Sequence, residues 1–328
     1  MYGMSEPIDR SSTEIACADE TASSGRVAIL LATYNGERFL DAQLTTIAKQ
    51  TVPCVDVHVS DDGSTDATEE LLRDWARRWH KGAFTISRGP GKGFAENFRA
   101  LLTADLEADY VAFCDQDDLW EPKKLEVAIE RLSRAPSECP AVFGSRTRAI
   151  SENGEELGLS PLFKAPPRFE NCLVQSLAGG NTIVMNRAAH TLVGEASLRT
   201  PFVSHDWWCF QIVTGAGGSA FYEPEPLIRY RQHGANLVGQ NSSLQDILRR
   251  VRRGWGGQFS DWNERNLAAL NTCADLLTPA ARQVLKSFAQ ARAGAPVARL
   301  RALRRSGVYR QGFVGQASLY AACLLNRI

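Results

Sequence analysis

The chain has 328 residues, of which 44% are hydrophobic and 23% are charged. This length and composition are typical of a soluble globular protein with one large domain or two modest ones, and they exclude a chain too polar to bury a core. Lys plus Arg equals Asp plus Glu, at 37 each, so the net charge alone indicates no class of partner.

The two ends of the chain differ in charge. Residues 249–328 contain fourteen basic and three acidic residues, which leaves 23 basic and 34 acidic residues in 1–248. An acidic front with a basic end predicts an anionic surface, either a membrane or a nucleic acid, as the partner of the basic part.

The cysteines and the apolar runs indicate where the protein works. The eight cysteines are scattered, with no CxxC pair and no His/Cys metal spacing, as in proteins of a reducing compartment. Residues 1–25 are polar and acidic, without the apolar centre of a signal peptide, and we expect a disordered leader there. No apolar run reaches the roughly 18 residues of a spanning helix. A cytoplasmic location is therefore expected.

The first part of the chain alternates short apolar runs with helical patterns. Strands are expected at 26–33, 55–60, 84–87 and 110–114. Helices are expected at 39–49, 67–80, after Gly93 and at 123–134. The continuous apolar run at 26–33 is typical of a central parallel strand covered on both faces. The alternation predicts an α/β fold with a parallel sheet and right-handed crossovers.

Beyond residue 134 the pattern loosens. Strands or extended segments are expected at 141–145, 181–185 and 220–231, with a long loop at 151–168 and an apolar helix at 204–214. From residue 242 onward the pattern is helical and rich in Ala, Leu and Arg. We therefore divide the chain into a leader (1–25), an α/β domain (26–241) and a basic helical region (242–328).

Three carboxylates follow the fourth predicted strand within four positions: Asp115, Asp117 and Asp118. Crowded carboxylates raise one another's pKa unless a cation lies among them. Ligands of open α/β sheets bind beyond the carboxyl ends of the strands, where Asp-X-Asp offers oxygen ligands to a divalent cation. The alternative is a solvated acidic turn that favours the start of the next helix.

Five motifs in order carry a resemblance to a known family. They are Ala32–Gly36, Ser60–Asp66, Cys114–Asp118, His205–Trp207 and Arg231–Asn236. Together they resemble the family 2 glycosyltransferases of the GT-A fold, inverting enzymes that use nucleotide-diphosphate sugars. Within that family the chain is most similar to the bacterial rhamnosyltransferase-like branch, which builds cell-surface polysaccharides. The resemblance covers about residues 26–239 and implies a Rossmann-like, mostly parallel mixed sheet flanked by helices, followed by the helical C-terminal region.

The resemblance implies a set of nucleotide-binding residues. They are Thr33, Tyr34, Asn35, Asp61, Asp62, Asn97 and Asp115. A carboxylate such as Asp61 can accept the imide N–H of uracil or thymine, or a ribose hydroxyl. The alternative for these positions is an ordinary turn with helix-capping residues. The loop 89–93 matches neither phosphate-loop pattern, which excludes an NTPase or dinucleotide site.

Metal binding and catalysis are also assigned through the resemblance. It implies that Asp115 and Asp117 bind Mg²⁺ or Mn²⁺ on the diphosphate, and that His233 completes the metal site. Asp206 is the candidate general base, because inverting displacement needs one carboxylate to take the acceptor's proton. The alternative is that Asp206 caps the helix it opens.

The donor-sugar and acceptor side is assigned to five further residues: Asp118, Gly180, Asn181, His205 and Trp207. Gly180 suits this place because glycine lets a backbone approach a ligand closely. For His205, a role in orienting Asp206 and a solvent-facing position both remain open.

The expected function is transfer of a sugar, rhamnose from dTDP-rhamnose, onto a lipid-linked saccharide, with Mg²⁺ or Mn²⁺ as cofactor. Residues 247–255 mix Arg with apolar residues and Trp, which is typical of interfacial helices and indicates peripheral contact with the inner face of the cytoplasmic membrane. A soluble helical subdomain or a dimer contact is the alternative for this region. Nucleic acid is not expected, since aromatic stacking motifs are missing.

Three alternatives to the expected transfer remain. One is a non-catalytic nucleotide-sugar-binding or scaffold protein. Another is a family 2 transferase of galactofuranose, N-acetylhexosamine or glucose. An enzyme that makes nucleotide sugars would need a Gly-rich, Lys-bearing loop after the first strand, where this chain has Thr33–Gly36.

Overall fold

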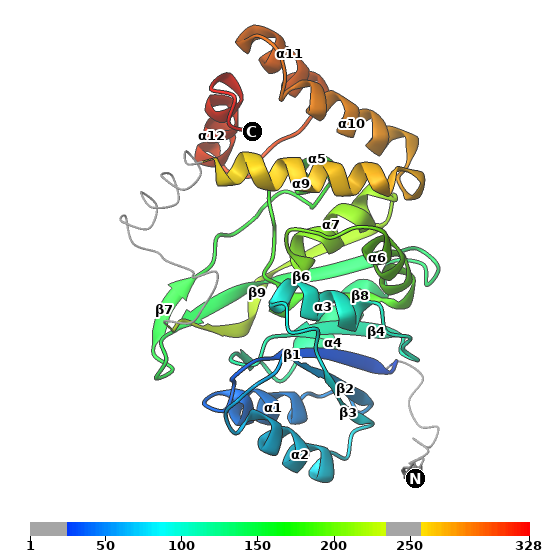
Figure 1. The fold of residues 1–328 in the computed structure, drawn as a ribbon, viewed down its shortest axis with the longest axis vertical. Coiled ribbons are helices and arrows are strands. Elements are labelled where there is room, and N and C mark those ends of the chain that lie inside the picture. Colours follow the sequence, from blue (N-terminus) through cyan, green and yellow to red (C-terminus); the bar gives the residue numbers. More distant parts are fainter. Residues whose placement is uncertain (1–24, 234–256) are drawn as a thin grey trace, which may run out of the picture.

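A computed structural model describes residues 25–233 and 257–328. A central sheet carries helices on both faces, and the C-terminal helices pack beyond one of them (Figure 1). The strand order is β3-β2-β1-β4-β8-β6-β9-β5, with β7 paired to β6. This mixed α/β architecture confirms the fold class expected from the sequence.

The first four strands are parallel, as the alternating pattern predicted. They are β1 (Val27–Thr33), β2 (Val55–Asp61), β3 (Phe84–Arg88) and β4 (Tyr110–Cys114). β1 pairs with both β2 and β4, and β3 extends the sheet beyond β2. Their carboxyl ends therefore lie along one edge, which brings the loops that carry the sequence motifs together.

The second half of the sheet is mixed. Its strands are β5 (Leu119–Trp120), β6 (Ala141–Ile150), β7 (Glu156–Leu159), β8 (Val184–Asn186) and β9 (Ser219–Arg231). β8 runs antiparallel to β4 and β6, whereas β6 and β9 are parallel. The expected loop 151–168 contains β7, so that expectation was wrong in part. All four β7 residues are exposed, and only pairing with β6 makes the segment a strand.

Helices surround the sheet and continue to the C-terminus. They are α1 (Leu40–Ala48), α2 (Thr68–Arg78), α3 (Phe94–Leu102), α4 (Lys124–Leu132), α5 (Phe169–Cys172), α6 (Arg187–Arg199), α7 (His205–Gly215), α9 (Gln258–Thr272), α10 (Pro279–Gln290), α11 (Pro296–Ser306) and α12 (Phe313–Leu324). The sequence did not predict α6, because its buried face is built from small and polar residues such as Ala189, Ser197 and His190. Within the described ranges, none of these helices is long and apolar enough to cross a membrane.

Two hydrophobic cores lie on opposite faces of the sheet. Along β1, Ala28 and Leu30 face the core of α3, α6 and α7, whereas Val27, Ile29 and Leu31 face the core of α1, α2 and α4. This alternation explains the continuous apolar run, since side chains of a strand point to opposite faces in turn.

The C-terminal helices join the first of these cores. Leu270, Phe288 and Leu303 are buried in the same cluster as α6 and α7. The helical region is therefore packed onto the α/β domain. The boundary expected at residue 242 lies outside the described residues, as does the expected leader 1–25 except for its last residue, Gly25.

Candidate active site

The loops after β1 and β2 bind each other through their polar side chains. Thr33 Oγ1 donates to Asp61 Oδ1 at 2.8 Å, and the Asn35 N–H donates to Ser64 Oγ at 2.8 Å. The N–H of Thr65 donates to Asn35 Oδ1, and Asp61 Oδ2 accepts the N–H of Ser64, both at 2.8 Å. Thr33, Asn35 and Asp61, predicted to bind nucleotide, thus already hold one another and the turn after β2.

Tyr34 is the exposed member of this group, with 58% of its surface accessible. Its backbone is held by Gln116 of the acidic loop, which accepts the Tyr34 N–H and donates to its carbonyl, both at 2.9 Å. A Cβ on Gly36 would collide with the Gln116 side chain, so a larger residue at that position would displace Gln116 from its place. Sequence reasoning missed Gln116 because it occupies the variable place inside Asp-X-Asp. The contact sets the acidic loop against the end of β1.

Asp62 and Asn97 organise the loop 89–93. Asp62 accepts the N–H groups of Gly91 at 2.6 Å and of Gly93 at 2.7 Å. Asn97 is 1% exposed and donates to the carbonyl of Ser60 at 2.9 Å. Asn97 therefore lies on the inward side of α3 and supports the end of β2, which corrects the prediction that its side chain faces a nucleotide.

The acidic loop and the start of α7 lie close enough for their charges to interact. Burial, together with the charges of Asp117 and Asp206, raises the pKa of Asp115 to about 7, and Lys124 opposes the shift. Asp206 lies 91 residues from Asp115 in the chain, so the fold brings the candidate general base towards the acidic loop.

The end of β9 also returns to the acidic loop. Nε2 of His233 lies 2.7 Å from Oδ2 of Asp117, although the two residues are 116 positions apart. The imidazole stacks on Phe39, with the ring centroids 5.0 Å apart. Both side chains are mostly buried, with 11% of His233 and 16% of Asp117 accessible. Asp117 and His233, two of the three residues assigned to a metal, are therefore in direct contact.

The donor atoms of this region suit a divalent cation in their chemistry. Carboxylate oxygens are preferred by Mg²⁺, and Mn²⁺ also accepts imidazole nitrogen. The mutual repulsion of Asp115 and Asp117 is what a cation would relieve. Within residues 25–233 and 257–328, no group of three His, Cys, Asp or Glu side chains is arranged to hold a metal ion. The residues therefore fit a cation that takes most of its ligands from water and substrate.

Asp118 turns away from the site. It is fully buried, accepts the amide of Asn181 on Oδ2, and accepts the N–H of Arg231 on Oδ1 at 3.0 Å. The Arg231 side chain in turn donates to the carbonyl of Asp117 at 3.0 Å. Asp118 and Asn181, assigned to the sugar side from the sequence, instead join three separate segments inside the protein.

Asp206 lies in the first turn of α7, where Ser204 holds the N-cap position. The capping interpretation of Asp206 is therefore wrong. The hydroxyl of Ser176 donates to Asp206 Oδ2 at 2.9 Å, and the carboxylate remains partly accessible. The structure thus presents a carboxylate held by one hydrogen bond and open to further donors.

His205 and Trp207, the neighbours of Asp206, point into the core. The His205 ring lies among Phe98 and Phe113, with centroids 4.0 and 4.7 Å away, and burial lowers its pKa to about 4 although Asp206 opposes the shift. The Trp207 indole donates to the carbonyl of Cys172. These placements correct the assignment of both side chains to the sugar side, and the solvent-facing option for His205 was wrong.

Gly180 lies directly against the His205 ring. A Cβ at Gly180 would overlap the imidazole Nε2, so the close approach that requires glycine is to this ring. Because His205 is adjacent to Asp206 in α7, the contact sets the segment around Gly180 against the start of that helix.

Lys124 lies fully buried beneath the acidic loop. Its Nζ is 3.1 Å from the centroid of the Trp120 ring, and burial lowers its pKa to about 7. The sequence analysis overlooked Lys124, although its place beside Leu125, four residues before Ala128, puts it on the apolar face of α4.

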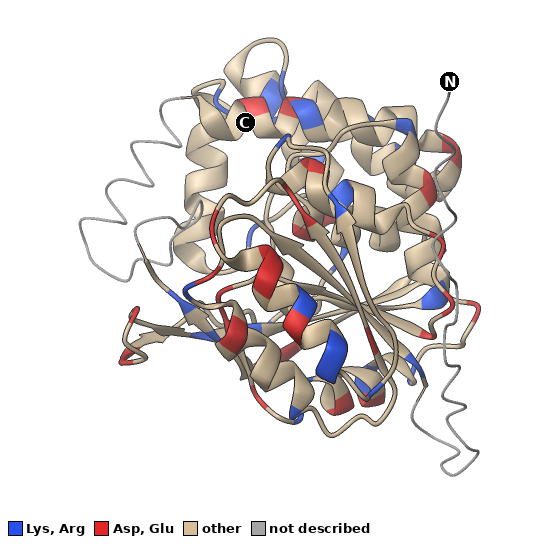
Figure 2. Ribbon diagram, turned by 60° about the horizontal axis from the view of Figure 1, so that its bottom comes forward, with Lys and Arg blue, Asp and Glu red and all other residues tan. Residues whose placement is uncertain are grey.

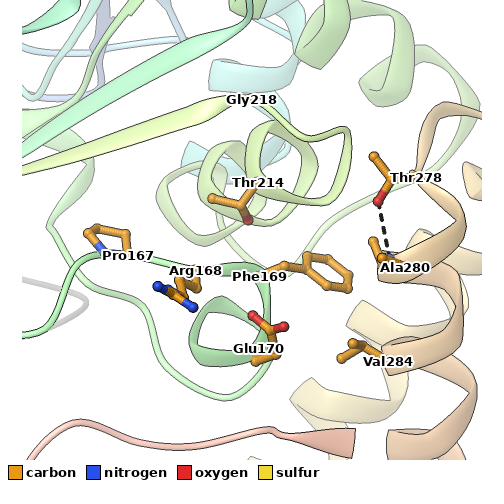
Figure 3. A pocket seen from close by; sticks show the side chains of 10 residues that line it. Pro167, Arg168, Phe169, Glu170, Thr214, Gly218, Thr278, Ala280 and Val284 are labelled. Carbon is orange, nitrogen blue, oxygen red and sulfur yellow. Dashed lines mark hydrogen bonds between the residues drawn. The ribbon is translucent and has the colours of Figure 1, made fainter.

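A separate cavity of about 250 Å³ lies between α5, the end of α7 and the start of α10 (Figure 3). Phe169, Thr214 and Val284 are among its lining residues. None of the predicted site residues lines it, so this cavity is distinct from the motif-bearing edge of the sheet.

Parallel strands that end in polar loops, with an acidic cluster at the switch between sheet halves, are typical of GT-A enzymes that use nucleotide sugars. The chain belongs to the glycosyl transferase family 2, whose family model matches residues 28–191, and it is a glycosyltransferase. The resemblance drawn from the sequence motifs is thereby confirmed.

The chain is also similar to individual glycosyltransferases of bacteria. The chain is 27% identical to the dTDP-rhamnosyl transferase RfbG of Shigella flexneri, over 69% of this chain and 80% of that protein. It is 25% identical to the putative teichuronic acid biosynthesis glycosyltransferase TuaG of Bacillus subtilis, over 53% and 67%. An uncharacterised protein of Mycobacterium tuberculosis is 27% identical, and the match spans 59% of its length.

The fold is similar to that of a solved transferase. The structure of S. aureus TarS 1-349 in complex with UDP-GlcNAc superposes with a TM-score of 0.50 at 17% identity, covering 87% of this chain and 93% of that one. At this identity the likeness establishes the GT-A type of fold.

Proposed function

We propose that this glycosyltransferase moves rhamnose from dTDP-rhamnose onto a lipid-linked cell-surface saccharide, by metal-dependent displacement with inversion. The similarity to RfbG supports the choice of donor. The observation that carries the proposal is the approach of Asp206, from α7, to the acidic loop after β4, where its charge acts on Asp115.

Donor binding is assigned to the end of β1 and the acidic loop. The exposed Tyr34 ring offers a flat surface to the base, and Gln116 fixes its backbone. Asp61 accepts hydrogen bonds from the hydroxyls of Thr33 and Ser64 and so holds the two loops together. Since the carboxylate of Asp61 is occupied in this way, we assign it the shaping of the base pocket.

The diphosphate is assigned to Asp117, His233 and Asp115 through Mg²⁺ or Mn²⁺. When bound, the cation would supply Lewis-acid stabilisation of the charge on the leaving nucleoside diphosphate. Asp117 and His233 lie 2.7 Å apart, so both donor groups are present at the same place in the fold. The raised pKa of Asp115 favours a cationic neighbour at neutral pH.

Asp206 is assigned the role of general base. Its partly accessible carboxylate can take the proton of an acceptor hydroxyl as that oxygen attacks the anomeric carbon from the face opposite the diphosphate. The Ser176 hydroxyl holds one carboxylate oxygen at 2.9 Å and leaves the other for the acceptor. Burial of His205 and Trp207 keeps the start of α7 rigid behind it.

The test is a panel of nucleotide sugars with and without Mg²⁺ or Mn²⁺. We expect dTDP-rhamnose plus metal to stabilise the protein most in thermal unfolding, since a ligand at a hundred times its Kd adds about 2.7 kcal/mol. With a lipid-linked acceptor, release of dTDP should require the metal. Preference for a UDP-hexose would contradict rhamnose as the donor sugar. Full turnover in the presence of a chelator would contradict the metal requirement. Donor binding without turnover would identify a scaffold protein.

A further inference from the structure

α12 presents an unusual exposed face. Its sequence from Phe313 to Leu324 contains no charged residue. Phe313 is 89% exposed and Val314 79%, and at the other end of the helix Leu324 is 42% and Leu325 54% exposed. We call this the α12 face; it also includes the exposed Ala317 and Ala321. At 100° per residue these positions share one side, while Leu319 and Cys323 on the other side are buried.

The C-terminal segment that contains α12 is strongly basic. Residues 276–328 contain nine Lys and Arg and no Asp or Glu. Six of these cations are exposed: Arg282, Lys286, Arg301, Arg304, Arg305 and Arg327. Within the part of the chain that the structure describes, none of the six forms an ion pair. Figure 2 marks the charged positions on the ribbon. α11, which carries Arg301, Arg304 and Arg305, packs against α12. Interfacial helices use exposed apolar residues together with unpaired cations on anionic lipid.

The α12 face is tied to the segment that holds the candidate base. Gln311, two residues before Phe313, donates its N–H to Gln175 Oε1 at 2.8 Å and its side-chain amide to the carbonyl of Ala165 at 2.8 Å. Ser176, the next residue after Gln175, donates to Asp206. The start of α12 is therefore fixed to the acceptor side of the site through a short series of direct contacts.

We propose that the α12 face docks on an anionic lipid bilayer, with Phe313 and Val314 inserted at the interface and the neighbouring arginines on lipid phosphates. The charge of residues 276–328 favours an anionic lipid surface over a neutral or basic protein face, since apolar insertion and cation excess act together at such a lipid interface. Resting on the proposed function, the docking would hold the Asp206 side of the site where a lipid-linked acceptor lies.

The first test measures vesicle binding by the full chain without donor or acceptor. We expect co-sedimentation with vesicles of phosphatidylcholine and anionic phosphatidylglycerol, weakened by salt. The double variant Phe313→Ser/Val314→Ser should partition at least about tenfold less. Leu198→Ser, which removes a 70% exposed apolar side chain from α6, is the matched control and should bind as the wild type does.

A second set of variants tests the charges. Arg301→Gln/Arg304→Gln/Arg305→Gln should lower binding to anionic vesicles about tenfold or more, with little change on neutral vesicles. The control Lys49→Gln/Arg73→Gln/Arg77→Gln removes three exposed cations from α1 and α2, at the opposite end of the molecule (Figure 1). Equal binding of the wild type and the α12 double variant would overturn the proposal.

The same proteins test a second copy of the chain as another occupant of the α12 face. Sedimentation equilibrium that shows a wild-type dimer, and a monomer for the Phe313→Ser/Val314→Ser variant, would assign the α12 face to a second copy and overturn lipid docking. An unchanged accessibility of residue 313, probed by labelling Phe313→Cys with and without vesicles, would also overturn it.

Measurements of enzyme activity distinguish membrane docking from the sugar-transfer reaction. Donor hydrolysis in solution should be equal in the wild type and the α12 double variant, while transfer to a vesicle-borne acceptor should fall about tenfold in the variant. Vesicle binding without any donor turnover would leave docking intact and reject the proposed transfer. Equal transfer to vesicle-borne acceptor by both proteins would reject the functional link.

Discussion

Two adjacent regions of the site differ in how their polar groups are hydrogen-bonded. The first region comprises the ends of β1 and β2, and the second comprises the acidic loop and α7. At the first, Thr33, Asn35 and Asp61 are satisfied by one another and by neighbouring turn residues. At the second, both ring nitrogens of His205 and the Nζ of Lys124 lack a hydrogen-bond partner among the described residues. Buried polar groups without partners are costly. The polar groups of the first region are satisfied within the protein. The buried polar groups of the second region carry an electrostatic cost that a charged ligand could relieve.

The largest expected effect comes from the less satisfied region. Asp206→Asn keeps the shape and the contact to Ser176 but removes the proton acceptor, so transfer should fall by about 10² to 10⁴-fold. Donor affinity, measured by calorimetry, should stay within about twofold of the wild type because the base lies on the acceptor side. Ser176→Ala, which removes only the orienting hydrogen bond, should lose far less. Unchanged kcat in Asp206→Asn would return this carboxylate to a structural role.

Asp117→Ala should come next. It removes one donor of the Asp117–His233 pair, and we expect metal-stimulated transfer to fall at least about a hundredfold. Calorimetric titration of Mn²⁺ should show the lost affinity directly. Thr65→Ala, in the satisfied region, is the control and should keep its metal response. If Asp117→Ala and Thr65→Ala respond to metal in the same way, the proposed assignment of nucleotide binding to the first region and metal binding to the second is wrong.

His205 makes the stability depend on pH. Burial lowers its folded pKa to about 4 from 6.5, so the unfolded chain binds the extra proton between these values. Its contribution to the free energy of unfolding is full above about pH 6.5 and is lost towards pH 4, by up to about 3 kcal/mol. His205→Phe should lose that dependence, as measured by urea unfolding across the range.

Asp115 acts in the opposite direction over the same range. Its folded pKa is raised to about 7 from 3.8, so its contribution to stability is present at low pH and declines as pH rises towards 7. Once His205 no longer offsets it, the His205→Phe variant should gain stability on acidification relative to the wild type. Parallel curves for the two proteins would show that the His205 ring does not titrate as proposed.

The smallest effect tests the contact that joins the two regions. Gln116→Ala removes two hydrogen bonds to the Tyr34 backbone and should raise the KM for donor by about tenfold with kcat nearly kept. Gly36→Ala should do the same, because the new methyl displaces the Gln116 side chain. The double variant should lose less than the two effects combined, since the clash disappears with the glutamine. Additive losses would show that the contact is not what sets Tyr34.

Local sequence patterns were sufficient to predict most of the strands and helices of the first half of the chain. The strands of the parallel sheet half were expected because each is a short apolar run bounded by turn residues. β7 and α6 were missed because an exposed edge strand and a helix with small buried residues lack such a pattern. The long β6 was foreseen only in its first half, where it is apolar.

The motifs that form the candidate site could be predicted from the sequence, but the role of each residue within them could not. Asp61 and Asp115 each end a strand at the same edge, and nothing in the sequence distinguishes them. Asp118 differs from Asp117 by one position, yet it is buried on Asn181 while Asp117 meets His233. A one-residue step at a strand end reverses the direction of a side chain, and its partner comes from a distant segment.

The sequence by itself determined the family and the edge of the sheet where the chemistry lies, because motif letters and the period of apolar residues are local properties. Only the tertiary structure decided which polar groups are occupied and which are open to ligand. Their partners lie 28 residues away for Thr33 and Asp61 and 116 for Asp117 and His233. The burial that places the His205 ring among Phe98 and Phe113 exists only once helices and sheet are packed together.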